Sequence, residues 1–435
     1  MSTARTCSAG FTLVLVVSLL VLVPPAAAGG IRAIADANAP SSANGIRVIE
    51  NSVEHSFAQH VTFTLEASSD AEISEVYLFF RAIHDEATEK KRVSLEDPSQ
   101  DVSLEVRHDA MRYPLPPFAE ITYWWQITNA AGQELKTPPQ QFTYHDNRFS
   151  WDRLSGDGIT IHWMTGDGDP AFAQTALDIA RASVRDIEAE LRGSKPDPLE
   201  VFIYDSEANL QGAMVLTGRD WVAGQARPEL GVVVVAVPEA QGYTSRMKRY
   251  LPHEITHLLL YELVTPNGYT YVPTWLNEGL ATANERLPTP EYALVLEKAR
   301  RAGELIPLED LCVPFSPDAQ TATLSYAQSG SLVSFIREEH GAQGIRQLLA
   351  AYADGASCKS GVEEGLGVTF RELEADWQMS LNPDSGWRTL LDKVGLWIVV
   401  PIIGLLLAVP MMGGLRRRSK ELPTEGEGAE LKRVS

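Results

Sequence analysis

Hydrophobic and polar residues alternate along the chain between residues 45 and 147. Apolar side chains take every second position in the runs Val61/Phe63/Leu65, Val76/Leu78/Phe80, Val102/Leu104/Val106 and Tyr123/Trp125/Ile127. Stretches rich in turn-forming residues, such as Glu96-Asp97-Pro98, interrupt this alternation. A period of two is typical of β-strands, and several short strands predict a β-sandwich of the immunoglobulin or fibronectin type. The range contains no cysteine, which excludes the disulfide of antibody domains.

The pattern changes at about residue 148. It predicts a strand over 158–163, an amphipathic helix over 170–191, strands over 199–204 and 232–237, and helices from there to about residue 381. The expected fold class is therefore α+β, with the sandwich over 45–147 and an α/β plus helical domain over 148–385. Residues 29–44 lack periodicity and predict a linker. The sandwich either binds a substrate or partner or acts as a spacer, and we favour the spacer.

Both ends of the chain carry long apolar segments. Near the start, Arg5 precedes the apolar run Phe11–Val23 and a stretch of small residues, which predicts a signal peptide over 1–28. Near the end, residues 394–415 carry no charge and are long enough to cross a bilayer as one helix. Three arginines follow directly, so residues 416–435 are predicted to form a cytoplasmic tail. We therefore expect a single-pass protein of the cell membrane whose signal peptide is cleaved and whose main domains lie outside.

Charge and cysteine content narrow the possible partners. The formal net charge is -20 over 435 residues, which argues against a nucleic-acid partner, because phosphate binding requires a basic surface. Cys7 lies in the predicted signal peptide, so Cys312 and Cys358 remain. In an oxidising compartment this pair either forms a disulfide or stays as two buried thiols, and the sequence leaves both open.

The clearest chemistry lies in the segment His253-Glu254-Ile255-Thr256-His257. Residues four apart share one face of a helix, so His253 and His257 can bind one cation while Glu254 stands beside it. Zinc accepts neutral imidazoles and usually takes three protein ligands plus a water in catalytic sites. Glu254 would then be the general base that activates the zinc-bound water. The alternative is a helical face with two ordinary histidines.

A second segment, Trp275-Leu276-Asn277-Glu278-Gly279-Leu280-Ala281, follows on the C-terminal side. Together the two segments resemble gluzincin-type zinc metallopeptidases, which include M1-type aminopeptidases and peptidase MA-like domains. The resemblance covers about residues 150–381 and implies a zincin-like fold. It also implies one zinc ion per chain, with His253, His257 and Glu278 as its ligands.

The same resemblance implies two further features of the cleft. A strand before the metal helix is expected to border the cleft and pair with extended substrate, and Gly231–Ala236 is the candidate, with a fully buried strand as the alternative. Two roles are open for Tyr326, in the segment Leu324–Ser331. Its hydroxyl either donates to the oxyanion of the tetrahedral intermediate as a catalytic group, or its ring packs on the helical core.

Two features depart from the family pattern. Pro252 directly precedes His253, and it predicts that the metal helix begins or kinks there. M1-type aminopeptidases bind the substrate's free amine through a GxMEN motif, but here Gly212-Ala213-Met214 is followed by Val215. We therefore expect a membrane-anchored extracytoplasmic zinc metallopeptidase that hydrolyses peptides or proteins as an endopeptidase rather than an aminopeptidase. The alternative function is an inactive peptidase-like scaffold that acts in cell-surface binding or adhesion.

Overall fold

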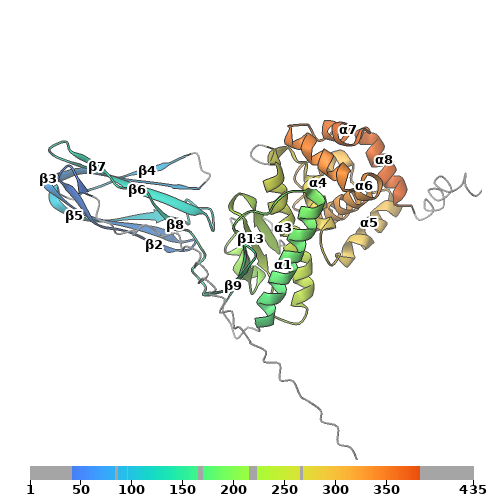
Figure 1. The fold of residues 1–435 in the computed structure, drawn as a ribbon, viewed down its shortest axis with the longest axis horizontal. Coiled ribbons are helices and arrows are strands. Elements are labelled where there is room, and N and C mark those ends of the chain that lie inside the picture. Colours follow the sequence, from blue (N-terminus) through green and yellow to red (C-terminus); the bar gives the residue numbers. More distant parts are fainter. Residues whose placement is uncertain are drawn as a thin grey trace, which may run out of the picture.

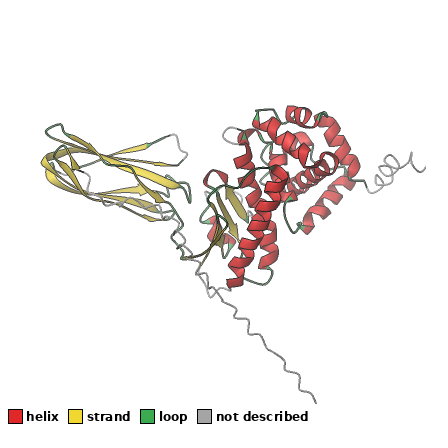
Figure 2. Ribbon diagram, in the orientation of Figure 1, coloured by secondary structure: helices red, strands yellow, loops and turns green. Residues whose placement is uncertain are grey.

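The computed structural model describes residues 42–83, 87–95, 97–164, 170–214, 223–264 and 268–382. These residues form a mixed α+β structure, in which a strand-rich part is followed by a second sheet and helices (Figure 1, Figure 2). The predicted signal peptide (1–28), membrane span (394–415) and tail (416–435) lie outside the described residues. Within the described ranges, no helix combines the length and apolar character needed to cross a bilayer.

The first part of the structure is one curled antiparallel sheet of eight strands. The strands are β1 (Ser42–Ala43), β2 (Ile46–Ser56), β3 (His60–Ala82), β4 (Glu89–Val93), β5 (Ser99–Asp109), β6 (Glu120–Asn129), β7 (Glu134–Lys136) and β8 (Gln140–Thr143). The first half of β3 pairs with β2 and β5, and its second half pairs with β4 and β6. The immunoglobulin or fibronectin type of this sheet stays a prediction.

The length of β3 corrects the prediction of several short strands. The alternating runs around Phe63 and Phe80 lie on this one strand of 23 residues. The pairing register shifts between Ser68 and Ile73, so the strand changes partners without a turn. The rings of Phe63 and Phe80 stack with centroids 5.3 Å apart. The two halves of β3 therefore face each other across a single core.

The second sheet has five strands in the order β12-β13-β11-β10-β9. They are β9 (Trp151–Gly156), β10 (Ile159–Met164), β11 (Leu199–Tyr204), β12 (Gly224–Arg227) and β13 (Val232–Ala236). The neighbours β10, β11 and β13 run parallel, whereas β9 and β12 run antiparallel at the edges. The strands predicted at 158–163, 199–204 and 232–237 are thus confirmed. The expectation that Gly231–Ala236 is an edge strand that pairs with extended substrate is wrong, because β12 pairs with β13 on that side, and the alternative of a fully buried strand is confirmed.

The position of β13 explains its unbroken apolar sequence. Val233 packs in the core shared with the helices, whereas Val234, on the other face, packs in the core shared with the first sheet. The first sheet reaches this face through Phe118, whose ring lies 4.3 Å from that of Phe202. Both faces of the second sheet are therefore covered, which favours a continuous apolar run over an alternating one.

The helices follow the predicted positions. They are α1 (Pro170–Leu191), α2 (Glu207–Gln211), α3 (Tyr243–Val264), α4 (Thr274–Ala283), α5 (Pro290–Ala302), α6 (Ala319–Ala353), α7 (Ser360–Leu366) and α8 (Phe370–Ser380). The predicted helix over 170–191 is α1, and the helical stretch up to about residue 381 is confirmed by α3 to α8. Of the two possibilities at Pro252, a helix start is wrong, because α3 begins at Tyr243 and contains Pro252, and a kink stays a prediction.

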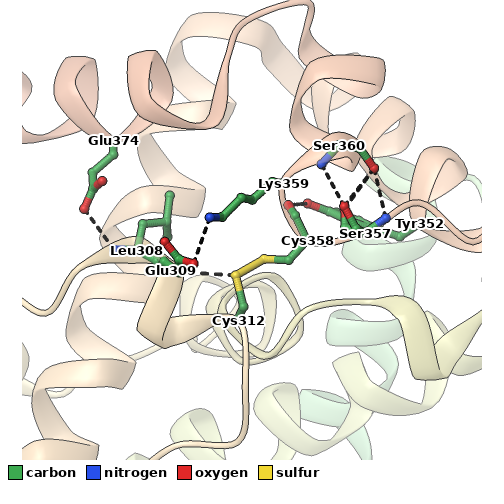
Figure 3. Close-up of a disulfide and its surroundings, with 9 residues drawn as sticks. All are labelled: Leu308, Glu309, Cys312, Tyr352, Ser357, Cys358, Lys359, Ser360 and Glu374. Atoms are coloured by element: carbon green, nitrogen blue, oxygen red, sulfur yellow. Dashed lines mark hydrogen bonds and ion pairs between the residues drawn. A yellow bond between two sulfur atoms is a disulfide. The ribbon is translucent and has the colours of Figure 1, made fainter.

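A disulfide joins Cys312 and Cys358, whose Cα atoms lie 6.1 Å apart (Figure 3). Lys359 and Glu309 form an ion pair of 2.8 Å beside it. The main-chain carbonyl of Cys312 accepts a hydrogen bond of 3.3 Å from the N–H of Thr274, the first residue of α4. The disulfide therefore fixes a segment that supports the beginning of α4.

Replacing both cysteines by serine is expected to lower the free energy of unfolding by about 2–4 kcal/mol, because the bond restricts the unfolded chain. Urea unfolding of the full chain, followed by circular dichroism, measures this loss. Dithiothreitol should destabilise the wild type by a similar amount and leave the double serine variant unaffected. Equal unfolding midpoints for the oxidised, reduced and serine proteins would contradict a stabilising bond.

Candidate metal centre

Two helices bring the three predicted ligands together. His253 and His257 lie one turn apart on α3, and Glu278 lies on α4. The Oε2 atom of Glu278 is 3.5 Å from Nε2 of His253 and 3.6 Å from Nε2 of His257. One candidate ligand atom from each residue lies within 4.8 Å of the other two. The three side chains thus form a cluster that is able to hold a metal ion.

The spacing of these atoms fits a central ion better than direct hydrogen bonds. Separations of 3.5 and 3.6 Å exceed the usual N–H···O distance of about 2.7–3.2 Å. Two ligand atoms that each lie about 2.0–2.1 Å from a tetrahedral zinc ion are about 3.4 Å apart. Two imidazoles and one carboxylate are also a donor set that zinc accepts. Both the geometry and the chemistry of the cluster therefore suit zinc.

The charges around His253 favour a cation at the same place. Its Nδ1 atom lies 3.4 Å from Oε1 of Glu285, while its Nε2 atom faces Glu278. Burial lowers the pKa of His253, but the carboxylates of Glu278 and Glu285 outweigh burial and raise this pKa to about 10. Glu285 is only 9% exposed, so water screens its charge poorly. A positive charge, carried by a proton or a metal ion, is therefore stabilised between the two helices.

The position of α4 against α3 depends on Pro252. Proline has no N–H, so it cannot bond to the carbonyl of Lys248 four residues earlier in α3. The N–H of Arg286, just after α4, donates to that carbonyl at 2.8 Å. Nearby, Thr256 Oγ1 donates to the Pro252 carbonyl at 2.7 Å and accepts from Asn284 Nδ2 at 3.1 Å. These bonds hold the end of α4 against α3 beside His253.

Asn277 orients the ring of His257. The Nδ1–H of His257 donates to Oδ1 of Asn277 at 2.8 Å, and Nδ2 of Asn277 donates to the hydroxyl of Tyr269 at 3.0 Å. Because Nδ1 carries the proton, Nε2 of His257 keeps its lone pair on the side of Glu278. Adjacent positions of α4 thus supply one ligand and the group that aligns another.

The sequence did not assign roles to Asn277 and Glu285. Asn277 stands inside the motif around Glu278, and Glu285 follows Glu278 by two helical turns, which is a weak signal for the same face. The role of each residue depends on how α4 packs against α3. The hydrogen bond from Arg286 to Lys248 contributes to this packing, and no local sequence pattern predicts it.

Glu254 lies between the ligand cluster and the edge strand β12. Its carboxylate lies so close to Gly224 that a Cβ atom added to this glycine would be 2.8 Å from Oε1. Burial raises the pKa of Glu254, and this effect exceeds the lowering by the imidazoles of His253 and His257 and by a backbone hydrogen bond from Ala226. Glu254 is therefore a stronger base here than a carboxylate in water.

Among the described strands β12 forms the edge of the second sheet, and its outer side faces Glu254. The N–H of Ala236 donates to the carbonyl of Ala223 at 2.9 Å. Hydrogen-bonded pairs alternate along an antiparallel ladder, so Gln225 also bonds to β13. The main-chain groups of Gly224 and Ala226 then point away from β13, which agrees with the bond from Ala226 to Glu254. The cluster is thus bordered by a strand with which no other described strand pairs on this side.

Tyr326 of α6 lies beside the cluster. Its ring centroid is 6.1 Å from that of His253, and its ring meets Phe315 edge-on at 5.2 Å. The side chain is half-buried and packs partly against the helical core. This position is compatible with both roles that the sequence left open.

Comparisons with known proteins identify one family. The model of the Peptidase MA superfamily matches residues 180–383, which contain all the predicted site residues. None of the curated proteins matches the chain significantly. Solved structures that are similar in part include wild-type OgpA from Akkermansia muciniphila, 8% identical over 24% of this chain and 30% of that chain, with a TM-score of 0.19. A bromine derivative of BhCBM56 is 10% identical over 24% of this chain and 97% of that chain, with a TM-score of 0.17.

The chain spans 30% of the length of OgpA, and these structural likenesses are too low to bear on fold or function. The family match stands apart from them because it covers α3 and α4, the helices that carry the ligand cluster. Residues 180–383 accordingly form a peptidase MA-like domain with a cluster of two histidines and a glutamate that is able to hold a metal ion.

Proposed function

We propose that the chain is an extracytoplasmic zinc metallopeptidase that cleaves peptide bonds inside proteins or peptides. The observation that carries the proposal is the convergence of His253, His257 and Glu278, with Glu254 between this cluster and an open strand edge. The match to the Peptidase MA superfamily supports a protease-like hydrolase. Zinc as the metal is supported by the donor set and by the spacing of its atoms.

Each residue of the proposed site has a separate role in catalysis. Zinc held by the three ligands supplies a Lewis acid that acidifies a water molecule and polarises a carbonyl. The carboxylate of Glu254 accepts the proton of the attacking water and later delivers it to the leaving nitrogen. Its raised pKa helps both transfers. The hydroxyl of Tyr326 donates a hydrogen bond to the oxyanion of the tetrahedral intermediate.

The edge strand β12 suits an extended peptide. A peptide can add to a sheet edge by main-chain hydrogen bonds, and the main-chain groups of Gly224 and the carbonyl of Ala226 point to this side of β12, while the N–H of Ala226 bonds to Glu254. Gly224 also lets the carboxylate of Glu254 lie close to the strand, because a Cβ atom at this position would be 2.8 Å from Oε1. The sequence lacks the GxMEN glutamate that would anchor a free amine, since Val215 follows Met214. These features support endopeptidase rather than aminopeptidase activity.

The location of the protein is proposed from sequence alone. The signal-like segment over residues 1–28 and the uncharged segment over residues 394–415, followed by arginines, support a single-pass membrane protein with a cytoplasmic tail. The peptidase domain would then lie outside the cytoplasm. An oxidising compartment also agrees with the bond between Cys312 and Cys358.

Metal content tests the proposed site. The purified full chain is expected to contain about one zinc ion, and Glu278→Ala or His257→Ala should remove it. Asn277→Ala should keep the site but weaken zinc binding by about 10–100-fold, because His257 loses the acceptor that aligns its ring. Elemental analysis and competition with a zinc chelator measure these changes. Glu338→Ala, at an exposed glutamate of α6, is the matched control, and zinc retained by Glu278→Ala would refute the ligand assignment.

Turnover tests the role of Glu254. Glu254→Gln should retain zinc and lower kcat by about 10²–10⁴-fold, since the amide cannot accept the proton of the attacking water. Cleavage of unfolded casein, followed by mass spectrometry of the fragments, gives the rate and separates internal from terminal cuts. Glu338→Gln should behave as the wild type. Full activity of Glu254→Gln would exclude it as the base, and a wild type that binds zinc but cleaves nothing would favour the scaffold alternative.

The hydroxyl of Tyr326 has its own test. Tyr326→Phe is expected to lower kcat by about 10²-fold with little change in KM, because a donor to the oxyanion acts mainly in the transition state. Steady-state kinetics on a quenched fluorescent peptide measure both constants. Tyr271→Phe removes a hydroxyl from an exposed ring and serves as the control. An unchanged kcat would assign Tyr326 to packing alone, because phenylalanine preserves the contact with Phe315.

A further inference from the structure

The outer face of the first sheet carries aromatic rings and cations in two neighbouring rows across its strands. The first row is formed by cross-strand pairs that join Arg92, Tyr77, Gln126 and Lys136. The second row joins Lys90, Phe79 and Trp124 in the same way. We call these two rows the cationic face and define it by Tyr77, Phe79, Lys90, Arg92, Trp124 and Lys136.

The rings of the cationic face are stacked between ammonium groups. The planes of Phe79 and Trp124 are 3° from parallel, with centroids 5.4 Å apart. The Nζ atom of Lys90 lies 4.1 Å from the ring centroid of Tyr77 and 5.4 Å from that of Phe79. From the first row, Nζ of Lys136 lies 5.0 Å from the ring of Trp124 in the second row. Neighbouring rings and ammonium groups thus cover the faces of these rings. A partner would contact the cations and the ring edges, which carry positive partial charge.

The distribution of charge makes this face unlike the rest of the chain. The formal net charge of the protein is -20, yet neither row contains an acidic residue. The acids on the same side of these strands lie at the ends: Glu75 and Glu134 pair with Thr128, and Glu120 pairs with Thr143. Glu75 also forms an ion pair of 3.1 Å with Arg92. An anionic partner is therefore attracted to the two rows, which lie midway along these strands, and is repelled by the net negative charge of the rest of the protein.

The shape of the face suits a linear polymer. The rows extend from β4 across β3 and β6 to β7, which at the usual strand spacing is about 14 Å. Cations stand at both ends of the first row, and the amide of Gln126 lies between them. A uronic-acid polysaccharide presents carboxylates separated by neutral hydroxyls, which matches cations separated by a neutral amide.

The cationic face and the proposed membrane anchor belong to different ends of the molecule. Figure 1 shows the first sheet and α8 at opposite ends of the molecule. Helix α8 ends at Ser380, shortly before the segment proposed to span the membrane. If that anchor is correct, the sheet that carries the cationic face lies at the end of the molecule opposite to the membrane, where extracellular material rather than lipid headgroups is within reach.

We propose that the cationic face binds an acidic polysaccharide and so holds the peptidase domain at material rich in such polymers. The binding is independent of metal and of peptidase activity. It also replaces the spacer role that the sequence favoured for this domain with a role in binding.

Isothermal titration of the full chain, in detergent, with polygalacturonate tests the proposal. We expect binding that weakens with added salt, and no binding of neutral dextran. Lys90→Glu/Lys136→Glu should weaken the affinity by about tenfold or more. Lys298→Glu/Arg371→Glu makes the same charge change at exposed positions of α5 and α8 and should have little effect. Zinc content and melting temperature should stay unchanged in both double variants.

Other outcomes overturn the proposal. Equal affinity for poly-L-glutamate and polygalacturonate would assign the face to an acidic protein partner instead. Binding that survives the Lys90 and Lys136 reversals, or falls equally in the control, would place the attraction elsewhere. If the charge-reversal variant does not fold, Lys90→Gln/Lys136→Gln replaces it, with a smaller loss in the same direction. Because Glu254→Gln should bind the polymer as the wild type does, failure of this proposal is distinguishable from failure of the proposed catalysis.

Discussion

The hydrogen bond from the N–H of Arg286 to the carbonyl of Lys248 sets the geometry of the candidate metal centre. This carbonyl is free because Pro252, inside α3, has no N–H to offer it. The carbonyl that Pro252 leaves without a helical partner accepts this bond instead, so the interior proline provides a specific contact point for the end of α4. Docking there places Glu278 against His253 and His257, and Glu285 behind His253. A residue that weakens the helix in isolation thus fixes the site between helices.

The sequence predicted that His253, His257 and Glu278 come together, because these residues lie in short, local patterns. The spacing of His253 and His257 depends only on the helical period, and Glu278 stands in a segment with a distinctive family resemblance. The strands and helices of the second part were likewise close to their predicted bounds, since strong apolar periodicity marked them. The roles of Asn277 and Glu285 were not predicted, because they depend on the contact between α3 and α4 rather than on either helix.

The errors in the predicted fold also arise from contacts between elements that are distant in the sequence. The run Val232–Ala236 is apolar at every position, and such a sequence is equally typical of an edge strand near a cleft and of a strand buried on both faces. The deciding neighbour, β12, is a short strand with the sequence Gly-Gln-Ala-Arg, which has no strong strand signal. In the first sheet, β3 continues through a polar stretch around Ser68 because a shift in pairing register replaces a turn. Both the position of β13 and the length of β3 depend on pairing between strands that are distant in the sequence. Local periodicity carries no information about such pairing.

The edge strand β12 also limits what can change around Glu254. The space above Gly224 is so small that a Cβ atom would contact the carboxylate, and the backbone bond from Ala226 holds the same group. Burial raises the pKa of Glu254, whereas the imidazoles and this backbone bond lower it, so the balance depends on how closely β12 approaches α3. A substrate that pairs with the open edge of β12 would lie beside Glu254 and exclude water from it. In the proposed mechanism, strand pairing and proton transfer would thus both depend on this short segment, and a side chain at Gly224 would have to move the carboxylate.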